Sequence, residues 1–426
     1  MSVWLVGLLL LLILVNVPIA VSLALMTVVA IVASGGVEAI PNVGLVMFSG
    51  ATKFPLIAIP LFILAGTIMN SSGISRRLVA FASALFGFIR GGLSMVSISA
   101  SMFFAEISGS AVADVAAMGS ILIPAMKKRG YTRNFAAAVT SSSATLAVII
   151  PPSIPMILYG VMSGASVVEL FVAGIIPGVI GGLLMMFVAY LWARRAKLPI
   201  EEAFRLKRVA ETFRDAGWSL LLPVIILGGI FSGWVTATEG AGIAVVAALV
   251  IGGGVYRELD TARLRQAMVV CGRQTAVVML LVAASALLGD FLTEARVPQR
   301  IAAAIIGFTE SKLAILALLN VFLLVIGLFL HSAAAIILVV PIVMPLVLAM
   351  GIDPVHFGLI VTLNLGIGQQ TPPVASVLVT ACSVARADIW AVTKANLGFI
   401  GVLGAVLLAV TYVPSISMVL VEMFYR

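Results

Sequence analysis

Charge is scarce in this sequence. Lys, Arg, Asp and Glu make up 10% of the 426 residues, whereas an ordinary soluble domain carries about 25%. A water-soluble surface cannot be built from that supply, so a soluble globular protein is excluded. Hydrophobic residues make up 62%, and apolar stretches near the roughly 20 residues that cross a membrane recur from end to end. We therefore expect a multi-pass membrane protein with roughly ten to thirteen helical elements.

The apolar runs also lack the alternation of apolar and polar residues that a membrane-spanning barrel requires. Residues 8–14, for example, are all Leu or Ile, which favours an all-α protein. No basic residue precedes Lys53, and no small-residue cleavage site follows a short apolar core. The first apolar stretch is therefore expected to be a retained span rather than a cleaved signal peptide.

Residues with catalytic chemistry are few. The chain has 2 Cys and 2 His, and it contains no His-Glu zinc motif, no Gly-Lys-Ser/Thr phosphate loop and no Gly-x-Ser-x-Gly elbow. Cys271 and Cys382 lie far apart in apolar contexts, so a disulfide framework is not indicated. We expect neither an enzyme nor an ATP-driven pump, and no cofactor.

The net charge of +8 follows from bases in short loops between apolar stretches, where Lys and Arg mark the cytoplasmic side. Nucleic acid is therefore not an expected partner. The loop at residues 127–133 is strongly basic, whereas residues 349–354, its counterpart in an internal repeat, contain no base. This asymmetry places the two loops on opposite sides of the membrane, so the repeats are expected to be inverted, as in many secondary transporters.

The repeat is read from a shift of about 221 residues, which superimposes Pro124 on Pro345, Gly130 on Gly351 and Pro151-Pro152 on Pro372-Pro373. Between the halves lies a basic segment with spaced apolar residues, typical of an amphipathic helix on the cytoplasmic membrane surface. The expected organisation is a first repeat at residues 1–193, a connecting helix at 194–217 and a second repeat at 218–426. Each repeat is expected to hold scaffold helices, a re-entrant hairpin and a broken helix, with hairpins near 95–125 and 322–350 and broken helices near 135–160 and 357–384.

The two Pro-Pro pairs interrupt apolar spans at equivalent places. Proline removes an amide donor, and backbone freed at membrane depth is tolerated where it lines a cavity or meets an ion. Carbonyl and hydroxyl oxygens without a carboxylate suit a weakly bound monovalent cation, so sodium is the leading candidate. Paired prolines also occur as plain kinks in membrane helices, but two equivalent pairs favour ion sites. Polar side chains near the breaks are candidates for the substrate cavity: Ser143, Ser153, Asn364 and Gln370.

A small-residue segment precedes each break, at residues 106–114 and 327–333. Such residues also allow plain close helix packing, but the functional interpretation is a hairpin whose tip closes over ion and substrate. Ionisable residues within membrane segments are costly and usually functional, which singles out Glu106, Asp114, Glu239 and His331. For Glu239 we favour a structural role at a helix start, and for His331 a neutral side chain with a hydrogen-bonded partner.

Five motifs together resemble the large membrane subunit of tripartite ATP-independent periplasmic (TRAP) transporters over essentially the whole chain. They are Ile107-Ser108-Gly109-Ser110, Ile149-Ile150-Pro151-Pro152-Ser153, Thr236-Ala237-Thr238-Glu239, Gly351-Ile352-Asp353-Pro354-Val355-His356-Phe357-Gly358 and Ile367-Gly368-Gln369-Gln370-Thr371-Pro372-Pro373-Val374. The resemblance implies an elevator-type permease in the bacterial inner membrane, embedded among membrane lipids. It would import a small organic anion, such as a dicarboxylate, keto acid or sugar acid, with sodium. A small four-helix membrane subunit and a periplasmic substrate-binding protein would be its separate partners.

The resemblance also implies two sodium sites. The first would use Ser108, Ser110, Ala147, Ile150 and Pro152, and the second Gly327, Gly368, Thr371 and Val374. The sequence departs from the family pattern around the second site, where it has His331, Gly366, Gln369-Gln370 and Ala375. An amide pair there suggests an unusual ligand.

Two rival functions are kept. The first is a stand-alone sodium- or proton-coupled carboxylate symporter of similar architecture. Only the family motifs argue against it, and uptake without a binding protein would favour it. An intramembrane enzyme or a structural scaffold is the remote alternative, which turnover of a lipid or peptide by the purified chain would revive.

Overall fold

The computed structural model describes residues 4, 7–9, 11–12, 15, 17–108, 111–198, 200 and 204–426, with the side chains of residues 104–108 and 113 excluded. In this part of the chain the named elements are all helical, and one isolated bridge joins Arg90 to Ile200. In chain order they are α2 (Ile19–Gly35), η1 (Val37–Ala39), α3 (Ile40–Ala51), η2 (Phe54–Ile57), α4 (Ala58–Ser71), α5 (Ile74–Phe86), α6 (Gly92–Ser108), α7 (Ala111–Lys128), α8 (Arg133–Ala144), η3 (Thr145–Val148), α9 (Ile154–Ser163), α10 (Val167–Arg195), α11 (Leu206–Phe231), α12 (Ala237–Leu249), η4 (Val250–Val255), α13 (Thr261–Glu294), α14 (Val297–Phe308), α15 (Lys312–Phe329), α16 (Ser332–Ala349), α17 (Pro354–Gly368), α18 (Ser376–Ala385), α19 (Ile389–Tyr412) and α20 (Ser415–Tyr425).

Eight helices in the described residues are long and apolar enough to cross a membrane. The described residues hold more helical elements than the ten to thirteen expected, because several expected spans are divided. The stretch near residues 135–160 is split into α8, η3 and α9, and the stretch near 357–384 into α17 and α18. Of these pieces, α9, α17 and α18 are apolar helices of 10–17 residues, and each break contains a Pro-Pro pair.

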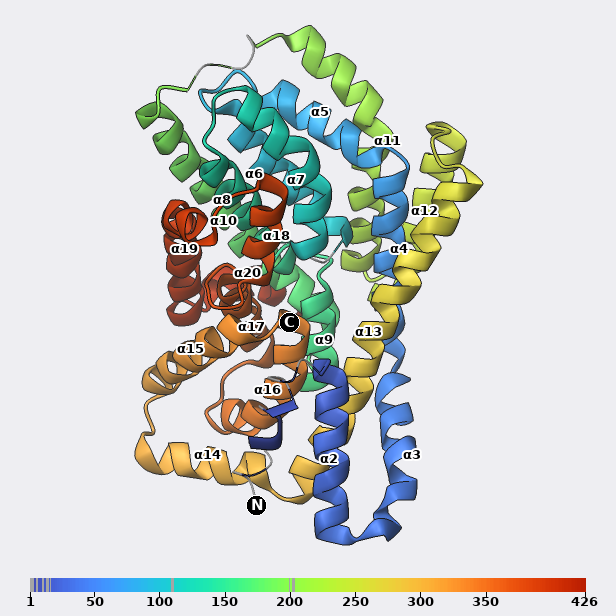
Figure 1. Cartoon of the computed structure of the whole chain (residues 1–426), viewed down its shortest axis with the longest axis vertical. Helices are drawn as coiled ribbons and strands as arrows, with labels where there is room; N and C mark the ends of the chain where they lie inside the picture. Colours follow the sequence, from blue (N-terminus) through green and yellow to red (C-terminus); the bar gives the residue numbers. More distant parts are fainter. Residues whose placement is uncertain are drawn as a thin grey trace.

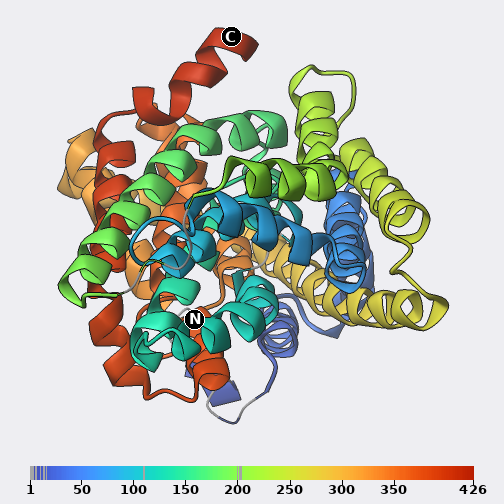
Figure 2. The ribbon, with the colours of Figure 1, turned by 90° about the horizontal axis from the view of Figure 1, so that it is seen from above.

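The helices gather into two sides that meet along the middle of the molecule (Figure 1). On one side α13 packs against α2, α3 and α4, and α12 packs against α4 and α11. On the other side α8 packs against α6, α7, α18 and α19, and α15 packs against α17. The view from above keeps α4 and α13 on one side and α19 on the other (Figure 2). Helices α9 and α16 pack together, and α16 also packs against α13.

The two ends of the basic segment at residues 194–217 belong to two long helices, α10 and α11. Helix α10 continues to Arg195, and α11 begins at Leu206 and runs without interruption to Phe231. The amphipathic sequence near 206–217 is therefore the first half of α11, and the membrane-compatible sequence after it is the second half. Residues 199 and 201–203 of the expected connecting helix lie outside the described residues.

Helix starts follow local sequence chemistry. Thr236 is the N-cap of α12, its hydroxyl accepts a hydrogen bond from the Glu239 amide, and the Glu239 carboxylate accepts one from the Thr236 amide. This reciprocal arrangement is a capping box, which satisfies two amides that a helix start leaves unpaired. The expected structural role of Glu239 is confirmed.

Candidate functional site

The first break joins α8 to α9 through η3 and residues 149–153. Every residue from Thr145 to Ser153 is buried. The amides of Ile149 and Ile150 both donate to the Leu146 carbonyl, and Pro151 has no amide to donate to the carbonyl of Ala147. The predicted ligands Ala147, Ile150 and Pro152 therefore lie in non-α-helical backbone in the interior of the protein, as their motif suggested.

Helix α10 lies directly against this break, and glycines allow it. A Cβ atom at Gly174 would lie 2.2 Å from the carbonyl oxygen of Ile149, and one at Gly178 would lie 2.5 Å from Cγ1 of Ile150. Neither distance is tolerated between real atoms, so any other residue there must push α10 away. The first break is therefore packed tightly on the α10 side.

The second break runs from Gln369 to Ala375, between α17 and α18. The Thr371 amide donates to the Gly368 carbonyl, and the Thr371 hydroxyl donates to the Ile367 carbonyl over 3.1 Å. Ala375 has a φ angle of +43°, the left-handed region that L-residues seldom occupy. Pro373 and Val374 are exposed, so this break, unlike the first, has an accessible edge.

The end of α15 meets the second break backbone to backbone. A Cβ atom at Gly368 would lie 2.5 Å from Cα and 2.7 Å from the carbonyl oxygen of Gly327. The amide of Val374 donates to the carbonyl of Leu328 over 3.3 Å. The four residues predicted for the second sodium site, Gly327, Gly368, Thr371 and Val374, are thus brought to one place by two separate elements.

The two breaks touch each other. A Cβ atom at Gly366, in α17, would lie 2.8 Å from Cγ2 of Thr145, the first residue of η3. Gln370 crosses the same boundary, since its Nε2 donates to the Ser141 carbonyl over 2.8 Å and to the Thr145 hydroxyl over 2.5 Å. The residues just before the second Pro-Pro pair therefore contact residues just before the first.

All hydrogen-bonding groups of the Gln370 side-chain amide have partners within the protein. Its side chain is fully buried, and its Oε1 accepts hydrogen bonds from the Ser141 hydroxyl and from Nδ2 of Asn396. The Asn396 Oδ1 in turn accepts a hydrogen bond from Ser142. We expected Gln370 at the substrate cavity, but this arrangement leaves it no donor or acceptor for a ligand. Sequence reasoning missed Asn396, for which a lone amide inside the apolar run of α19 was the available signal.

The other three cavity candidates are also fully buried, and they belong to separate networks. The Ser143 hydroxyl lies 3.0 Å from that of Ser101 in α6. Asn364 donates to Oδ1 of Asn320 in α15 over 2.7 Å, and Ser153 donates to the Val148 carbonyl. The four candidates do not line a common open cavity in this structure.

The first hairpin tip is only partly described. Ser110 lies outside the described residues, and Ser108 ends α6 with its side chain among those excluded, as is that of Glu106. Asp114 is buried in α7. Among the described residues, no group of three or more His, Cys, Asp or Glu side chains is placed to hold a metal ion.

His331 differs from expectation. It is the N-cap residue of α16 but makes no side-chain capping bond, and its side chain is exposed. In the described part of the chain no hydrogen bond from its ring joins it to a partner. The expected hydrogen-bonded partner is therefore absent among the described residues.

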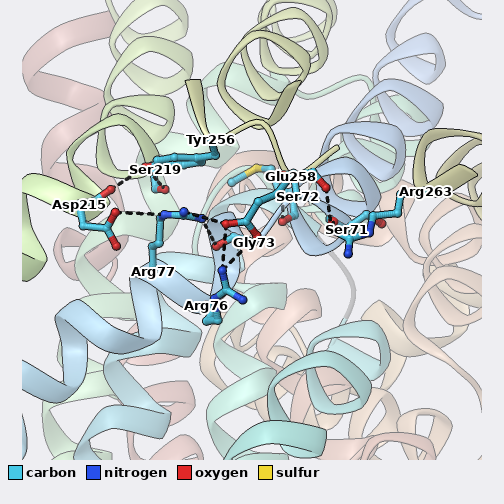
Figure 3. A network of polar contacts seen from close by, with 11 residues as sticks. Ser71, Ser72, Gly73, Arg76, Arg77, Asp215, Ser219, Tyr256, Glu258 and Arg263 are labelled. Atoms are coloured by element: carbon cyan, nitrogen blue, oxygen red, sulfur yellow. Dashed lines mark hydrogen bonds and ion pairs between the residues drawn. The ribbon is translucent and has the colours of Figure 1, made fainter. Parts of the chain in front are cut away.

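A polar network joins α5, α11 and the segment before α13 (Figure 3). Arg77 lies 2.7 Å from the Glu258 carboxylate and 3.2 Å from that of Asp215, and its guanidinium stacks over the Tyr256 ring at 3.8 Å. Arg76 adds a second ion pair to Glu258 at 2.9 Å. The hydrogen bond from Arg77 lowers the pKa of Glu258 below its usual range. This network fixes three elements of the α13 side together.

A smaller network lies at the start of α17. Arg426 forms ion pairs with Asp353 and with Glu169, the latter at 2.9 Å. Burial alone would raise the pKa of Asp353, but hydrogen bonds from Arg426 and from the amides of His356 and Val355 lower it. The contacts connect the C-terminal end of α20 to the first turns of α10 and α17.

These features define a multi-pass helical membrane transport protein with two broken helices that meet in its interior. The sequence profile of the family described as "Tripartite ATP-independent periplasmic transporter, DctM component" matches residues 6–416, and the chain belongs to this family. It is thus a large permease component of the bacterial inner membrane, in a family of transporters rather than enzymes.

Curated relatives agree with this assignment, and a solved structure shares the fold. The chain is 43% identical over 405 residues to the isethionate TRAP transporter permease protein DctMQ of Oleidesulfovibrio alaskensis, covering 95% of this chain but only 64% of the length of that relative. It is 36% identical to the C4-dicarboxylate TRAP transporter large permease protein DctM of Vibrio cholerae, covering 95% of this chain and 93% of the relative. The crystal structure of the Alcanivorax borkumensis YdaH transporter has a similar fold, with a TM-score of 0.65 at 15% identity over 93% of this chain and 90% of that one.

Proposed function

We propose that this protein imports a small organic anion across the bacterial inner membrane, coupled to sodium. The relatives are named for isethionate, C4-dicarboxylates, 2,3-diketo-L-gulonate and sialic acid. These compounds differ in size and skeleton but share a negative charge near neutral pH. The shared chemistry supports an organic anion as the substrate class.

The observation that carries the proposal is the meeting of the two breaks with the end of α15. Gly327 and Gly368 approach backbone to backbone, and the Val374 amide reaches the Leu328 carbonyl. Broken helices at membrane depth are stable where their freed carbonyls meet an ion or line a cavity. One sodium site would use Gly327, Gly368, Thr371 and Val374.

The other sodium site would lie at the first break. Its ligands would be Ser108, Ser110, Ala147, Ile150 and Pro152, with backbone carbonyls supplying most of the contacts. Bound cations, together with the positive N-terminal ends of α9 and α18, would present positive charge near the breaks and favour an anion there.

For the mechanism we propose an elevator. Helices α6 to α9 and α15 to α18 would form a mobile transport domain built from two inverted repeats, and the α13 side would form a fixed scaffold. Sodium would order the hairpin tips, after which the domain would carry anion and ions across as one body. A small four-helix membrane subunit and a periplasmic substrate-binding protein are the proposed partners, and the words tripartite and periplasmic in the family description support them.

The decisive experiment is the unfolding midpoint of the detergent-purified protein in sodium chloride and in choline chloride at equal ionic strength. An ion that binds only the folded state must stabilise it, so sodium should raise the midpoint. Thr371→Ala and Ser108→Ala should each weaken that rise. The matched control is Thr393→Ala, because Thr393 makes the same kind of hydroxyl-to-carbonyl bond, to Ile389 in α19, but lies away from the breaks.

Equal midpoints in the two salts would refute sodium coupling and favour a proton-coupled carrier. The elevator has a separate test in cysteine cross-links between α7 and α13. Two distinct registers should be trapped under different ion conditions, and one register under all conditions would contradict the mechanism.

A further inference from the structure

Lys53 lies between α3 and α4, close to one membrane surface. The span that follows it, Phe54–Ser71, has 18 residues and is therefore about 27 Å long, close to the hydrocarbon thickness of a bilayer. Its far end adjoins Arg76, Arg77 and Glu258 (Figure 3). The side of a span with the excess of Lys and Arg is the cytoplasmic one; two arginines at the far end outnumber the single Lys53, so Lys53 lies near the outer surface.

The Lys53 side chain lines two neighbouring cavities. One, of about 450 Å³, is bounded by Ser49, Lys53, Ser285, Asp290 and Thr293 among others. The second, of about 430 Å³, includes Thr236 and Thr238 in its wall. In the part of the chain that the structure describes, the Lys53 ammonium and the Asp290 carboxylate make neither a hydrogen bond nor an ion pair. Both residues are exposed, so two opposite charges without a partner in the described chain border one cavity.

Ser285 provides an independent sign of a missing ligand. Its side chain is 2% exposed, and its hydroxyl has no hydrogen-bond partner among the described residues. Buried polar groups are nearly always hydrogen-bonded, and a hydroxyl in a helix commonly bonds a carbonyl of the preceding turn. A side chain that forgoes this bond while lining a cavity is placed to bond an occupant.

The polar wall of the larger cavity is held in place. A Cβ atom at Gly50 would lie 2.1 Å from Cβ of Ala286, so α3 and α13 are in close contact at this point. Ser285 and Asp290 lie on this α13 face. The opposite wall includes Met162 of α9 and Pro341 of α16, so the cavity lies between elements that the proposed elevator holds fixed and elements that it moves.

We propose that this cavity is an outer-face anchoring site for a small organic anion that also carries a hydroxyl or ammonium group. Lys53 and Ser285 bind the anionic group, and Asp290 accepts a hydrogen bond from the hydroxyl or ammonium. The anion is held here before it reaches the breaks. The proposal rests on the proposed import of organic anions and adds to it a site and a substrate feature.

The test uses two pairs of anions, malate with succinate and isethionate with ethanesulfonate, whose members differ by one hydroxyl. Each is titrated against the full-length purified chain in sodium chloride, and the unfolding midpoint is recorded. At least one hydroxylated anion should stabilise the protein more than its partner does. Lys53→Met should weaken the apparent affinity at least tenfold, and Ser285→Ala several-fold.

Two further variants keep the test independent of folding defects. Lys53→Arg retains the charge and should retain most of the affinity, and Asp290→Asn should remove the preference for the hydroxylated anion while strengthening binding of the plain one. The control, Lys207→Met, alters a lysine whose side chain is 89% exposed and should change nothing.

The proposal is overturned if none of the four anions stabilises the protein, or if Lys53→Met and Asp290→Asn bind as the unaltered protein does. Sodium stabilisation, measured in the same samples without anion, reports separately on the proposed function. Intact sodium stabilisation with no anion effect rejects this site alone, whereas loss of the sodium effect in the unaltered protein rejects the coupling mechanism.

Discussion

The two breaks share a Pro-Pro signal but have different surroundings. Residues 145–153 are buried throughout, with α10 glycines against them. Around residues 371–374 the second break is partly open, and α15 rather than α10 lies against its backbone. Equivalent sequence has thus produced one enclosed element and one accessible element.

The largest expected effect on stability and on the sodium response comes from Gly368→Ala, at the backbone contact between Gly368 and Gly327. Gly368→Ala places a methyl group 2.4 to 2.7 Å from the backbone of Gly327, so α15 and α17 must separate. Overpacking of this kind costs about 1–3 kcal/mol or more, and the sodium-dependent rise of the unfolding midpoint should disappear. Gly404→Ala, in α19 with nothing within 4 Å of its Cβ position, is the control. A Gly368→Ala protein with the full sodium response would show that this contact is not part of an ion site.

Gln370→Leu separates a structural role from an ionic one. It removes the bonds to Ser141, Thr145 and Asn396, and each buried group left unpaired costs about 1–3 kcal/mol. The unfolding midpoint should fall equally in sodium and in choline, whereas Thr371→Ala should lower it in sodium only. Gln274→Leu, at an exposed position of α13, provides the matched control. A selective loss of the anion response in Gln370→Leu would restore the sequence-based expectation that this amide binds substrate.

The smallest effect is expected far from both breaks, at Glu258. Arg77 lowers the pKa of this carboxyl in the folded protein, so its ion pairs contribute stability above the unfolded pKa of about 4.3. That contribution is lost as the pH falls through the lower folded value. Glu258→Gln should cost about 1 kcal/mol or less at pH 7 and should flatten the acid limb of stability against pH.

The sodium response of Glu258→Gln should equal that of the unaltered protein, because the network lies on the α13 side. Unfolding midpoints across the acid range, with and without sodium, check both statements. A changed sodium response would mean that the network is coupled to the breaks and that the comparison of two independent regions is incomplete.

Much of the fold was predictable because the signals are local. Long apolar runs predicted membrane helices, the Pro-Pro pairs predicted the two interruptions, and Thr236 with Glu239 predicted a helix start. The predicted ligands Gly327, Gly368 and Val374 do lie together. The organisation into inverted repeats and the sodium sites themselves stay predictions, and the role of Ser110 falls outside the described residues.

The polar side chains near the breaks were less predictable. Gln370 was expected to face a substrate, yet its amide is hydrogen-bonded to Ser141, Thr145 and Asn396, which are 229, 225 and 26 residues away in sequence. His331 was expected to have a bonded partner and has none among the described residues. Whether a polar side chain faces a ligand or another side chain depends on which elements pack beside it, and sequence spacing carries no such information.

The sequence by itself determined the membrane class, the family and the places where helices must break, because hydrophobicity and the missing amide of proline act within a few residues. Only the tertiary structure decided that one break is enclosed and the other accessible, and that Lys53 shares a cavity with Ser285 and Asp290. The physical reason is that burial and pairing of charge are properties of elements brought together by packing. More than 200 residues of chain separate Lys53 from Ser285, and no local preference connects them.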